Sequence, residues 1–187
     1  MTTKAHLDWG MLTMREPDLE DVDRYADVLV SAYNDPKNAA LLGHVDQMTR
    51  DDVIEHYVDL AEDGSPFMLF EGGELVGDGD LRNRNGGGAE LSFLIASPSA
   101  QGKGLGTRFA LLLMTFGFRV LDLTTIFASV APQNVASLRV FEKLGFCLDN
   151  SVLGRSFAEE PSDRVFAIER EVFDHLHSAT IAAIVIR

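Results

Sequence analysis

The chain has 187 residues, 46% of them hydrophobic and 24% charged, a composition that suits one globular domain with a sizeable core. Its net charge of −13 argues against a nucleic-acid partner, because phosphate backbones are bound by basic surfaces. A single cysteine excludes an intrachain disulfide. No stretch is long and apolar enough to span a bilayer, and residues 1–8 lack the apolar core of a signal peptide. We therefore expect a cytoplasmic protein without a membrane partner.

Periodicity in the first half of the chain predicts amphipathic helices and short strands. Asp18 and Thr49 have side chains typical of N-caps, and apolar residues follow each of them at helical spacing. Short apolar runs bounded by Gly or Pro predict the strands. Residues 36–48 fit either a loop or a short helix. The expected helices are residues 19–33 and 50–62, and the expected strands are residues 11–17, 67–70, 74–82 and 90–96.

The second half alternates helices with strands after a glycine-rich turn. Gly145 is the expected C-cap of the second of these helices. Cys147, just beyond it, is expected to be a buried packing residue. The expected helices are residues 108 to about 121 and 134–144, and the expected strands are residues 124–130, 146–152 and 164–172.

This order of elements predicts an α/β fold, with a mixed sheet of about seven strands and helices on both of its faces. Residues 1–187 are expected to form one domain, with a core over about residues 11–172 and a tail over 173–187. The apolar segment 181–186 of that tail could cover a sheet edge, contact a neighbouring subunit or be disordered. The oligomeric state stays open between a monomer and a homodimer.

The most informative stretch is the strand at 90–96 with the turn that follows it. Glycines stand at positions 102, 104 and 106, so the backbone there can approach a ligand closely. N–H groups at the start of the next helix point outward, and Lys103 adds a positive charge, which together favour phosphate. The spacing fits neither the P-loop nor the dinucleotide fingerprint Gly-x-Gly-x-x-Gly. A tight turn without a ligand is the alternative.

Two motifs carry a resemblance to a known family. The pattern Gln101-x-x-Gly104-x-Gly106 resembles the pyrophosphate loop of the GCN5-related N-acetyltransferases (GNAT), which bind acetyl-coenzyme A. Residues 134–146, NVASLRVFEKLGF, resemble the Asn-x-x-Ser and Glu-Lys-Leu-Gly-Phe segment of the same family. The motifs occur in the family's order, with a predicted strand between them. In motif the chain is most similar to the branch that acetylates the N-termini of ribosomal proteins.

The resemblance implies a site for acetyl-coenzyme A between two diverging strands, residues 90–96 and 124–130. It implies that strand backbone binds the pantetheine arm, that loop N–H groups bind the pyrophosphate, and that the start of the helix at 134 contacts the cofactor near its thioester. No metal is implied, and the histidines stand at no metal-ligand spacing. The implied cofactor-binding residues are Leu94, Ile95, Ala96, Gln101, Gly102, Lys103, Gly104, Leu105, Gly106, Thr107, Asn134 and Ser137.

Attack of a neutral amine on a thioester requires a base, a donor for the oxyanion and an acid for the thiolate. Glu90 matches a glutamate of the N-terminal-acetylating branch and is the expected base; the alternative is an exposed residue at a strand end. The Leu94 N–H is the expected oxyanion donor, and Ser137 the expected proton donor. Many relatives carry a tyrosine where this chain has Phe141, which cannot donate a proton and fits a core position.

Charge along the chain favours a cationic acceptor. Residues 1–63 contain five Lys or Arg and fifteen Asp or Glu, and in the family this region borders the acceptor site. The alternative is that these acids only solvate two surface helices. Asp80 is a further candidate carboxylate on the substrate side.

We therefore expect direct transfer of an acetyl group from acetyl-coenzyme A to a primary amine: a protein N-terminus, an aminoglycoside-like sugar or a polyamine. Two other functions stay open. The first is a non-catalytic sensor of acyl-coenzyme A on the same fold, because Phe141 cannot act as the proton donor that many relatives have at this position. A nucleotide-binding domain would rest on the glycine-rich loop alone.

Overall fold

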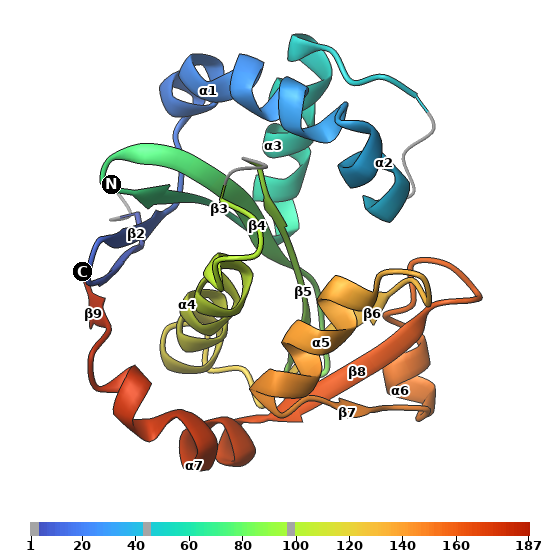
Figure 1. The fold of residues 1–187 in the computed structure, drawn as a ribbon. Helices are drawn as coiled ribbons and strands as arrows, with labels where there is room; N and C mark the ends of the chain where they lie inside the picture. Colours follow the sequence, from blue (N-terminus) through green and yellow to red (C-terminus); the bar gives the residue numbers. More distant parts are fainter. Residues whose placement is uncertain (1–3, 43–45, 97–99) are drawn as a thin grey trace.

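The computed structural model describes residues 4–42, 46–96 and 100–187 (Figure 1). The segment 36–48 includes residues 43–45, and the predicted turn after Ala96 includes residues 97–99. Both triplets lie outside the described ranges. The strands are β1 (His6–Trp9), β2 (Leu12–Arg15), β3 (Ser65–Glu71), β4 (Glu74–Asn85), β5 (Gly88–Ile95), β6 (Thr125–Val130), β7 (Cys147–Leu148), β8 (Arg164–Glu169) and β9 (Val185–Ile186).

The helices agree closely with the predicted ones where capping signals are local. Asp18 and Thr49 each accept a hydrogen bond from the N–H three residues on, as N-caps of α1 and α3. Gly145 adopts the left-handed conformation with a φ of 91°, as the C-cap of α5. The helices are α1 (Leu19–Tyr33), α2 (Pro36–Leu42), α3 (Arg50–Asp63), α4 (Leu105–Arg119), α5 (Val135–Leu144), α6 (Val152–Arg155) and α7 (Arg170–Ile181).

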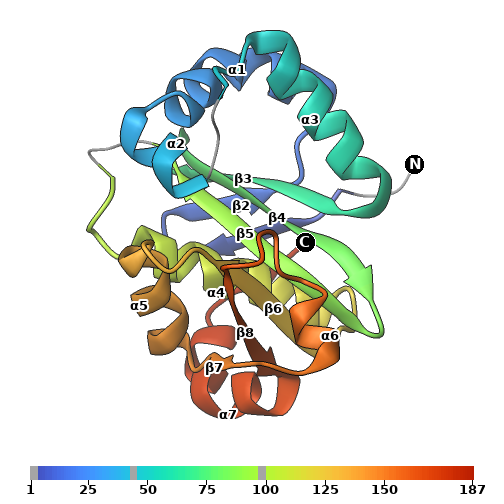
Figure 2. The ribbon, with the colours of Figure 1, turned by 90° about the vertical axis from the view of Figure 1, so that its right-hand side faces the viewer.

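A mixed sheet in the order β7-β8-β6-β5-β4-β3-β2-β1-β9 separates two layers of helices. Figures 1 and 2 show α1, α2 and α3 on one side of the sheet, and α4, α5 and α7 on the other. Two hydrophobic clusters fill these layers. The larger one contains most of α4, and the smaller one joins α1 and α3 to β3. The predicted α/β fold is confirmed.

The sheet is divided at its centre. The parallel pair β5–β6 is in register only from Gly88 opposite Thr125 to Glu90 opposite Phe127. Beyond this point β6 continues beside β8 as far as Val130 opposite Arg164, without a partner on its β5 side. A gap therefore opens between the second half of β5 and the end of β6, where the sequence predicted diverging strands.

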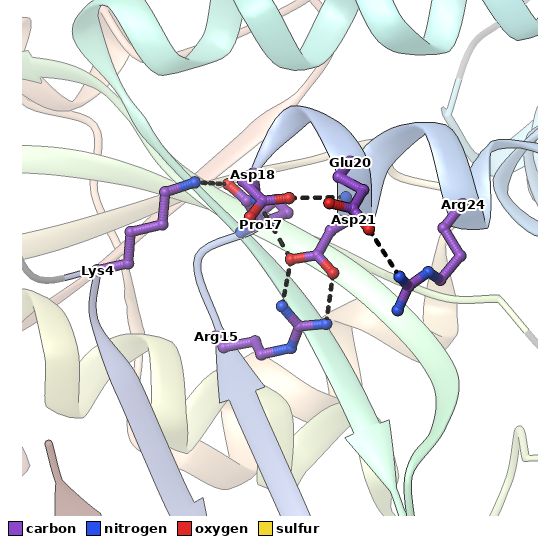
Figure 3. A network of polar contacts seen from close by, with 7 residues as sticks. All are labelled: Lys4, Arg15, Pro17, Asp18, Glu20, Asp21 and Arg24. Atoms are coloured by element: carbon purple, nitrogen blue, oxygen red, sulfur yellow. Dashed lines mark hydrogen bonds and ion pairs between the residues drawn. The ribbon is translucent and has the colours of Figure 1, made fainter.

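The start of α1 is fixed by a polar network (Figure 3). Asp18 and Asp21 form a reciprocal capping box, and the Asp21 carboxylate also binds the guanidinium of Arg15 on β2. The Arg15 guanidinium carbon lies 4.7 Å from the centre of the Phe70 ring on β3. Lys4 donates to the carbonyl of Pro17. These contacts anchor the start of α1 over the sheet.

Across the described residues the sheet has nine strands, where about seven were predicted. The two missed strands, β1 and β9, lie at one edge, where Leu7 pairs with Met14 of β2 and Ile186 of β9. Each is too short to show a period of its own. Of the possibilities for the apolar tail, the structure places residues 185–186 along a sheet edge.

Two predicted strands near the C-terminus were too long. The strand expected at 146–152 is limited to Cys147–Leu148, because Ser151 caps the short helix α6. The strand expected at 164–172 ends at Glu169, since Arg170 begins α7. The prediction of a buried Cys147 was wrong: the thiol is on the two-residue edge strand and exposed.

Candidate active site

The glycine-rich turn ends in a helix start without a side-chain cap. Gly102 and Gly104 have φ angles of +75° and +79°, which favour glycine. The first hydrogen bond of α4 runs from the Arg108 N–H to the Gly104 carbonyl at 3.2 Å. Within the described ranges, no protein oxygen accepts from the N–H groups of residues 104–107. These donors, at the positive end of a 15-residue helix, fit a pyrophosphate.

Side chains from three elements hold this turn in place. The amide nitrogen of Gln101 donates to the Ile95 carbonyl at 3.0 Å and to the Asn38 oxygen of α2 at 3.2 Å. A Cβ at Gly106 would lie 3.0 Å from the Phe93 ring, so glycine allows α4 to pack closely on β5. Lys103 is exposed, whereas the Leu105 side chain belongs to the core.

The register of β4 and β5 decides which backbone groups face the gap. The Ala96 N–H donates to the Val76 carbonyl at 2.9 Å. Asp78 stands opposite Leu94 in the same register, and hydrogen-bonded pairs recur every second residue of an antiparallel ladder. The main-chain groups of Leu94 are therefore directed at β4, as is the N–H of Ala96.

The neighbouring residues have the opposite orientation. The Ile95 carbonyl is turned away from β4, since it accepts from the Gln101 side chain. By the same alternation, the main-chain groups of Phe93 face the gap. This register does not support Leu94 as the oxyanion donor or Ala96 as an N–H donor to pantetheine; Phe93 and Ile95 have the required direction.

Two cavities lie along the gap. The first, which we call the loop cavity, has a volume of about 330 Å³ and is lined by the glycine-rich turn, β5 and α5. The second, the gap cavity, has about 170 Å³ and extends between the end of β6 and the loop that precedes β8. They are adjacent, because both are lined by Leu41, Leu42, Phe93, Asn134 and Ser137. The predicted residues Ile95, Gln101, Gly102, Gly104, Gly106 and Thr107 line the loop cavity.

The first turn of α5 supplies polar groups where the cavities meet. Asn134 is the N-cap, and its side-chain oxygen accepts from the Ser137 N–H at 3.1 Å, which leaves the Asn134 NH₂ as a donor. Phe141 is buried, with its ring centre 6.1 Å from Phe93 and 5.0 Å from Phe146. It has the core position that the sequence indicated.

Glu90 is buried and held by neighbours. Its side chain is 2% exposed, and its Oε2 accepts from the Asn83 amide at 2.7 Å and lies 3.5 Å from the Arg82 Nε. Burial raises the pKa of Glu90, and the charge of Arg82 opposes that rise. Glu90 lines neither cavity. The alternative of an exposed residue at a strand end was wrong, because the side chain is buried and bound by Asn83 and Arg82.

Two more carboxylates are buried on β4, on the face toward α1 and α3. Asp78 accepts hydrogen bonds from the hydroxyls of Tyr33 on α1 and Tyr57 on α3, and burial raises its pKa to about 6. Burial raises the pKa of Asp80 to about 7, against the charge of Arg82 at 3.7 Å. Among the described residues, neither the Asp78 nor the Asp80 Oδ1 has a hydrogen-bond partner. The two tyrosines were not foreseen, because helical spacing marks them only as packing residues.

Acidic side chains reach the gap cavity from an unexpected part of the chain. Glu159, Glu160 and Asp163, in the loop before β8, line it. The described residues of the acidic segment 1–63 contribute only Asn38, Leu41 and Leu42 to the two cavities. Two of the acids of α1, Asp23 and Asp27, form ion pairs with Arg50 of α3.

The described residues contain no cluster of three His, Cys, Asp or Glu side chains that could hold a metal ion. None of the helices in the described ranges combines the length and the apolarity that a bilayer crossing requires.

Comparison with known proteins supports the resemblance. Spermidine N(1)-acetyltransferase of Escherichia coli K12 is 35% identical over 86 residues, 46% of this chain and 45% of that enzyme. Human alpha/beta-tubulin-N-acetyltransferase 9 is 42% identical over 57 residues, 30% of this chain and 28% of that enzyme. The matched segments thus span less than half the length of these curated relatives.

Solved structures of acetyltransferases share the fold. Aminoglycoside acetyltransferase AAC(6')-Ib, in complex with coenzyme A, superposes with a TM-score of 0.73 over 89% of this chain and 99% of that chain, at 23% identity. A family model described as an acetyltransferase (GNAT) domain matches residues 11–147, where both motifs and the gap lie. The chain therefore belongs to the GNAT acetyltransferase family.

Proposed function

We propose that the protein transfers an acetyl group from acetyl-coenzyme A to a cationic primary amine. The observation that carries this proposal is that the loop cavity and the gap cavity are adjacent and share five lining residues. The loop cavity lies beside N–H groups that have no protein acceptor among the described residues, the gap cavity is lined by carboxylates, and Ser137 lines both. A thioester bound in the first cavity would face an amine bound in the second.

Each part of the cofactor has candidate partners. The N–H groups of residues 104–107 and the Lys103 ammonium would bind the pyrophosphate. The main chain of Phe93 and Ile95 would bind the pantetheine amides, as an added strand binds a sheet edge. The Asn134 NH₂ would donate near the thioester. When bound, acetyl-coenzyme A supplies an activated acyl group.

Transfer would be direct, through a ternary complex. The Phe93 N–H, which faces the gap, takes the oxyanion role first expected of Leu94. Ser137 is the proposed proton donor to the leaving thiolate, since Phe141 has no proton to give. Glu90 was the expected base, and its position is taken up in the next subsection.

A cationic acceptor is supported by the acids of the gap cavity. Glu159, Glu160 and Asp163 line it, and its lining within the described part of the chain contains no Lys or Arg. Two relatives are named for spermidine and for aminoglycosides, both of them polyamines in chemical class. A protein N-terminus, including that of a ribosomal protein, is a further acceptor of the proposed kind. We propose a cytoplasmic protein, and a monomer or a homodimer.

Thiol release in a panel of acceptors tests the proposal. We expect acetyl-coenzyme A to be consumed faster with spermidine, kanamycin or a basic peptide than with neutral primary amines, and the advantage to shrink at high ionic strength. Glu160→Gln should raise KM for the cations more than for the neutral amines. Cofactor binding in calorimetry without thiol release from any acceptor would instead support a binding module. Equal rates for neutral and cationic amines at all salt concentrations would contradict the cationic acceptor.

A further inference from the structure

A row of buried and half-buried polar side chains crosses the face of β4 and β5 beneath α1 and α3. Asp80 stands opposite Ser92, and Arg82 stands opposite Glu90, so these four side chains share one face of the sheet. Ser92 is the member of the row that lines the gap cavity. Arg82 extends the row to the cavity rim, because it also pairs with Glu159.

The two carboxylates of this row differ in what already binds them. Glu90 is fixed by the Asn83 amide and by Arg82, and it lies at the last paired position of β5 and β6. The Asp80 Oδ1 is buried and has no hydrogen-bond partner among the described residues, while its Oδ2 is 3.7 Å from Arg82. A proton acceptor requires a free lone pair, and of these two carboxylates Asp80 is the one with a buried oxygen that has no partner among the described residues. Neither carboxylate lines the loop cavity or the gap cavity, but Asp80 stands directly opposite Ser92, which lines the gap cavity.

We propose that Asp80, rather than Glu90, accepts the proton of the acceptor ammonium, and that Glu90 acts by positioning Arg82; this assignment rests on the proposed acetyl transfer. The ammonium gives one proton to the Asp80 carboxylate, directly or through one water beside Ser92. The neutral nitrogen then forms the C–N bond to the acetyl carbon as the C–S bond breaks. Its second proton goes to the thiolate, and Asp80 returns the first to solvent.

The surroundings of Asp80 suit this role. Burial raises the pKa of Asp80 to about 7, so its carboxylate is a base strong enough to act near neutral pH. The Arg82 charge opposes the rise, and the Glu90 charge adds to it. The titratable and charged groups that face Asp80 are Asp78 and Arg82 on β4, Glu90 on β5, Glu159 on the loop before β8, Tyr33 on α1 and Tyr57 on α3.

The dependence of kcat on pH separates the two carboxylates. Asp80→Asn should lower kcat by about 100-fold or more, the usual effect of losing a general base, and abolish the acidic limb of the profile. Glu90→Gln should keep that limb but move it to lower pH, because it removes a negative charge that raises the pKa of Asp80. Asp78→Asn, a matched buried carboxylate on the same strand, should also keep the limb and move it the same way.

The outcomes divide cleanly. If Glu90→Gln abolishes the limb, or Asp80→Asn retains it, this assignment is wrong even when the wild type is an active acetyltransferase. If the wild type releases no thiol with any amine, the proposed function itself fails. Calorimetry with coenzyme A should give unchanged affinity for all three variants and so establish that each is folded. If Asp80→Asn does not fold, Glu90→Gln still tests the assignment: an acidic limb that moves to lower pH supports Asp80 as the base, and a lost limb contradicts it.

Discussion

The side-chain oxygen of Asn134 accepts a hydrogen bond from the N–H of Ser137 at 3.1 Å, within the first turn of α5. This bond caps the helix and at the same time places both side chains on the wall that the loop cavity and the gap cavity share. One local sequence feature, Asn-x-x-Ser, therefore serves both folding and the site.

Ser137→Ala should lower kcat by about tenfold and leave KM for acetyl-coenzyme A nearly unchanged. The loss is smaller than for a typical general acid, because a thiol with a pKa of about 8.5 leaves with little help. Ser178→Ala, at an exposed position of α7 that lines neither cavity, is the control and should keep the wild-type kcat. Steady-state kinetics check both. A wild-type kcat for Ser137→Ala would remove this serine from the reaction.

Asn134→Ala should affect both stability and binding. Loss of an N-cap costs about 1 kcal/mol of unfolding free energy. The variant also loses the NH₂ donor, so its affinity for coenzyme A should fall, whereas Asn134→Asp should retain the cap without that donor. Urea unfolding and calorimetry measure the two effects separately. Restored affinity in Asn134→Asp would show that the donor is not needed.

Gly104→Asp should weaken coenzyme A binding by at least about tenfold, or 1.4 kcal/mol. It adds a carboxylate beside the N–H groups proposed to bind phosphate, at a φ of +79°. Gly73→Asp, in the β3–β4 hairpin at a φ of +90°, introduces comparable backbone strain away from the cavities. Calorimetry should find normal affinity for this control. Equal affinity in both variants would remove the turn from the cofactor site.

Asp80 should make the protein less stable as pH rises. Its pKa is about 7 in the folded state and near the ordinary 3.8 in the unfolded chain, so the folded state binds more protons between these values. The free energy of unfolding contributed by this group therefore falls from about pH 4 to about pH 7, by an amount on the order of a few kcal/mol. Asp80→Asn should flatten that fall in urea titrations at several pH values. An unchanged slope would contradict the buried, ionisable carboxylate.

Local signals in the sequence predicted most of the elements. Asp18, Thr49 and Gly145 mark helix ends through contacts within four residues, and all three are caps in the structure. The glycine spacing at 102–106 likewise predicted a turn that leads into a helix, and the family resemblance predicted the gap beside it. These features depend on neighbours in the chain, which a sequence displays directly.

The features that the sequence did not predict depend on residues far apart in the chain. The ion pair of Arg82 with Glu159 joins residues 77 positions apart, so the acids near the gap were sought in the N-terminal helices and not in the loop before β8. The orientation of the Leu94 main chain depends on its register with Asp78, which periodicity does not reveal. Strands as short as β9 exist only because β1 offers them an edge.

The unfinished ladder between β5 and β6 has a consequence for the melting behaviour of the protein. The main-chain groups of Phe93 and the Ile95 N–H have no strand partner on this side, whereas the Ile95 carbonyl accepts from Gln101, so a ligand with amides of its own would supply the missing partners. A ligand that binds only the folded state raises the free energy of unfolding, by about 2.7 kcal/mol at a hundred times its Kd. The apo protein should thus unfold at a distinctly lower temperature than the same chain in the acyl-donor concentrations of a growing cell.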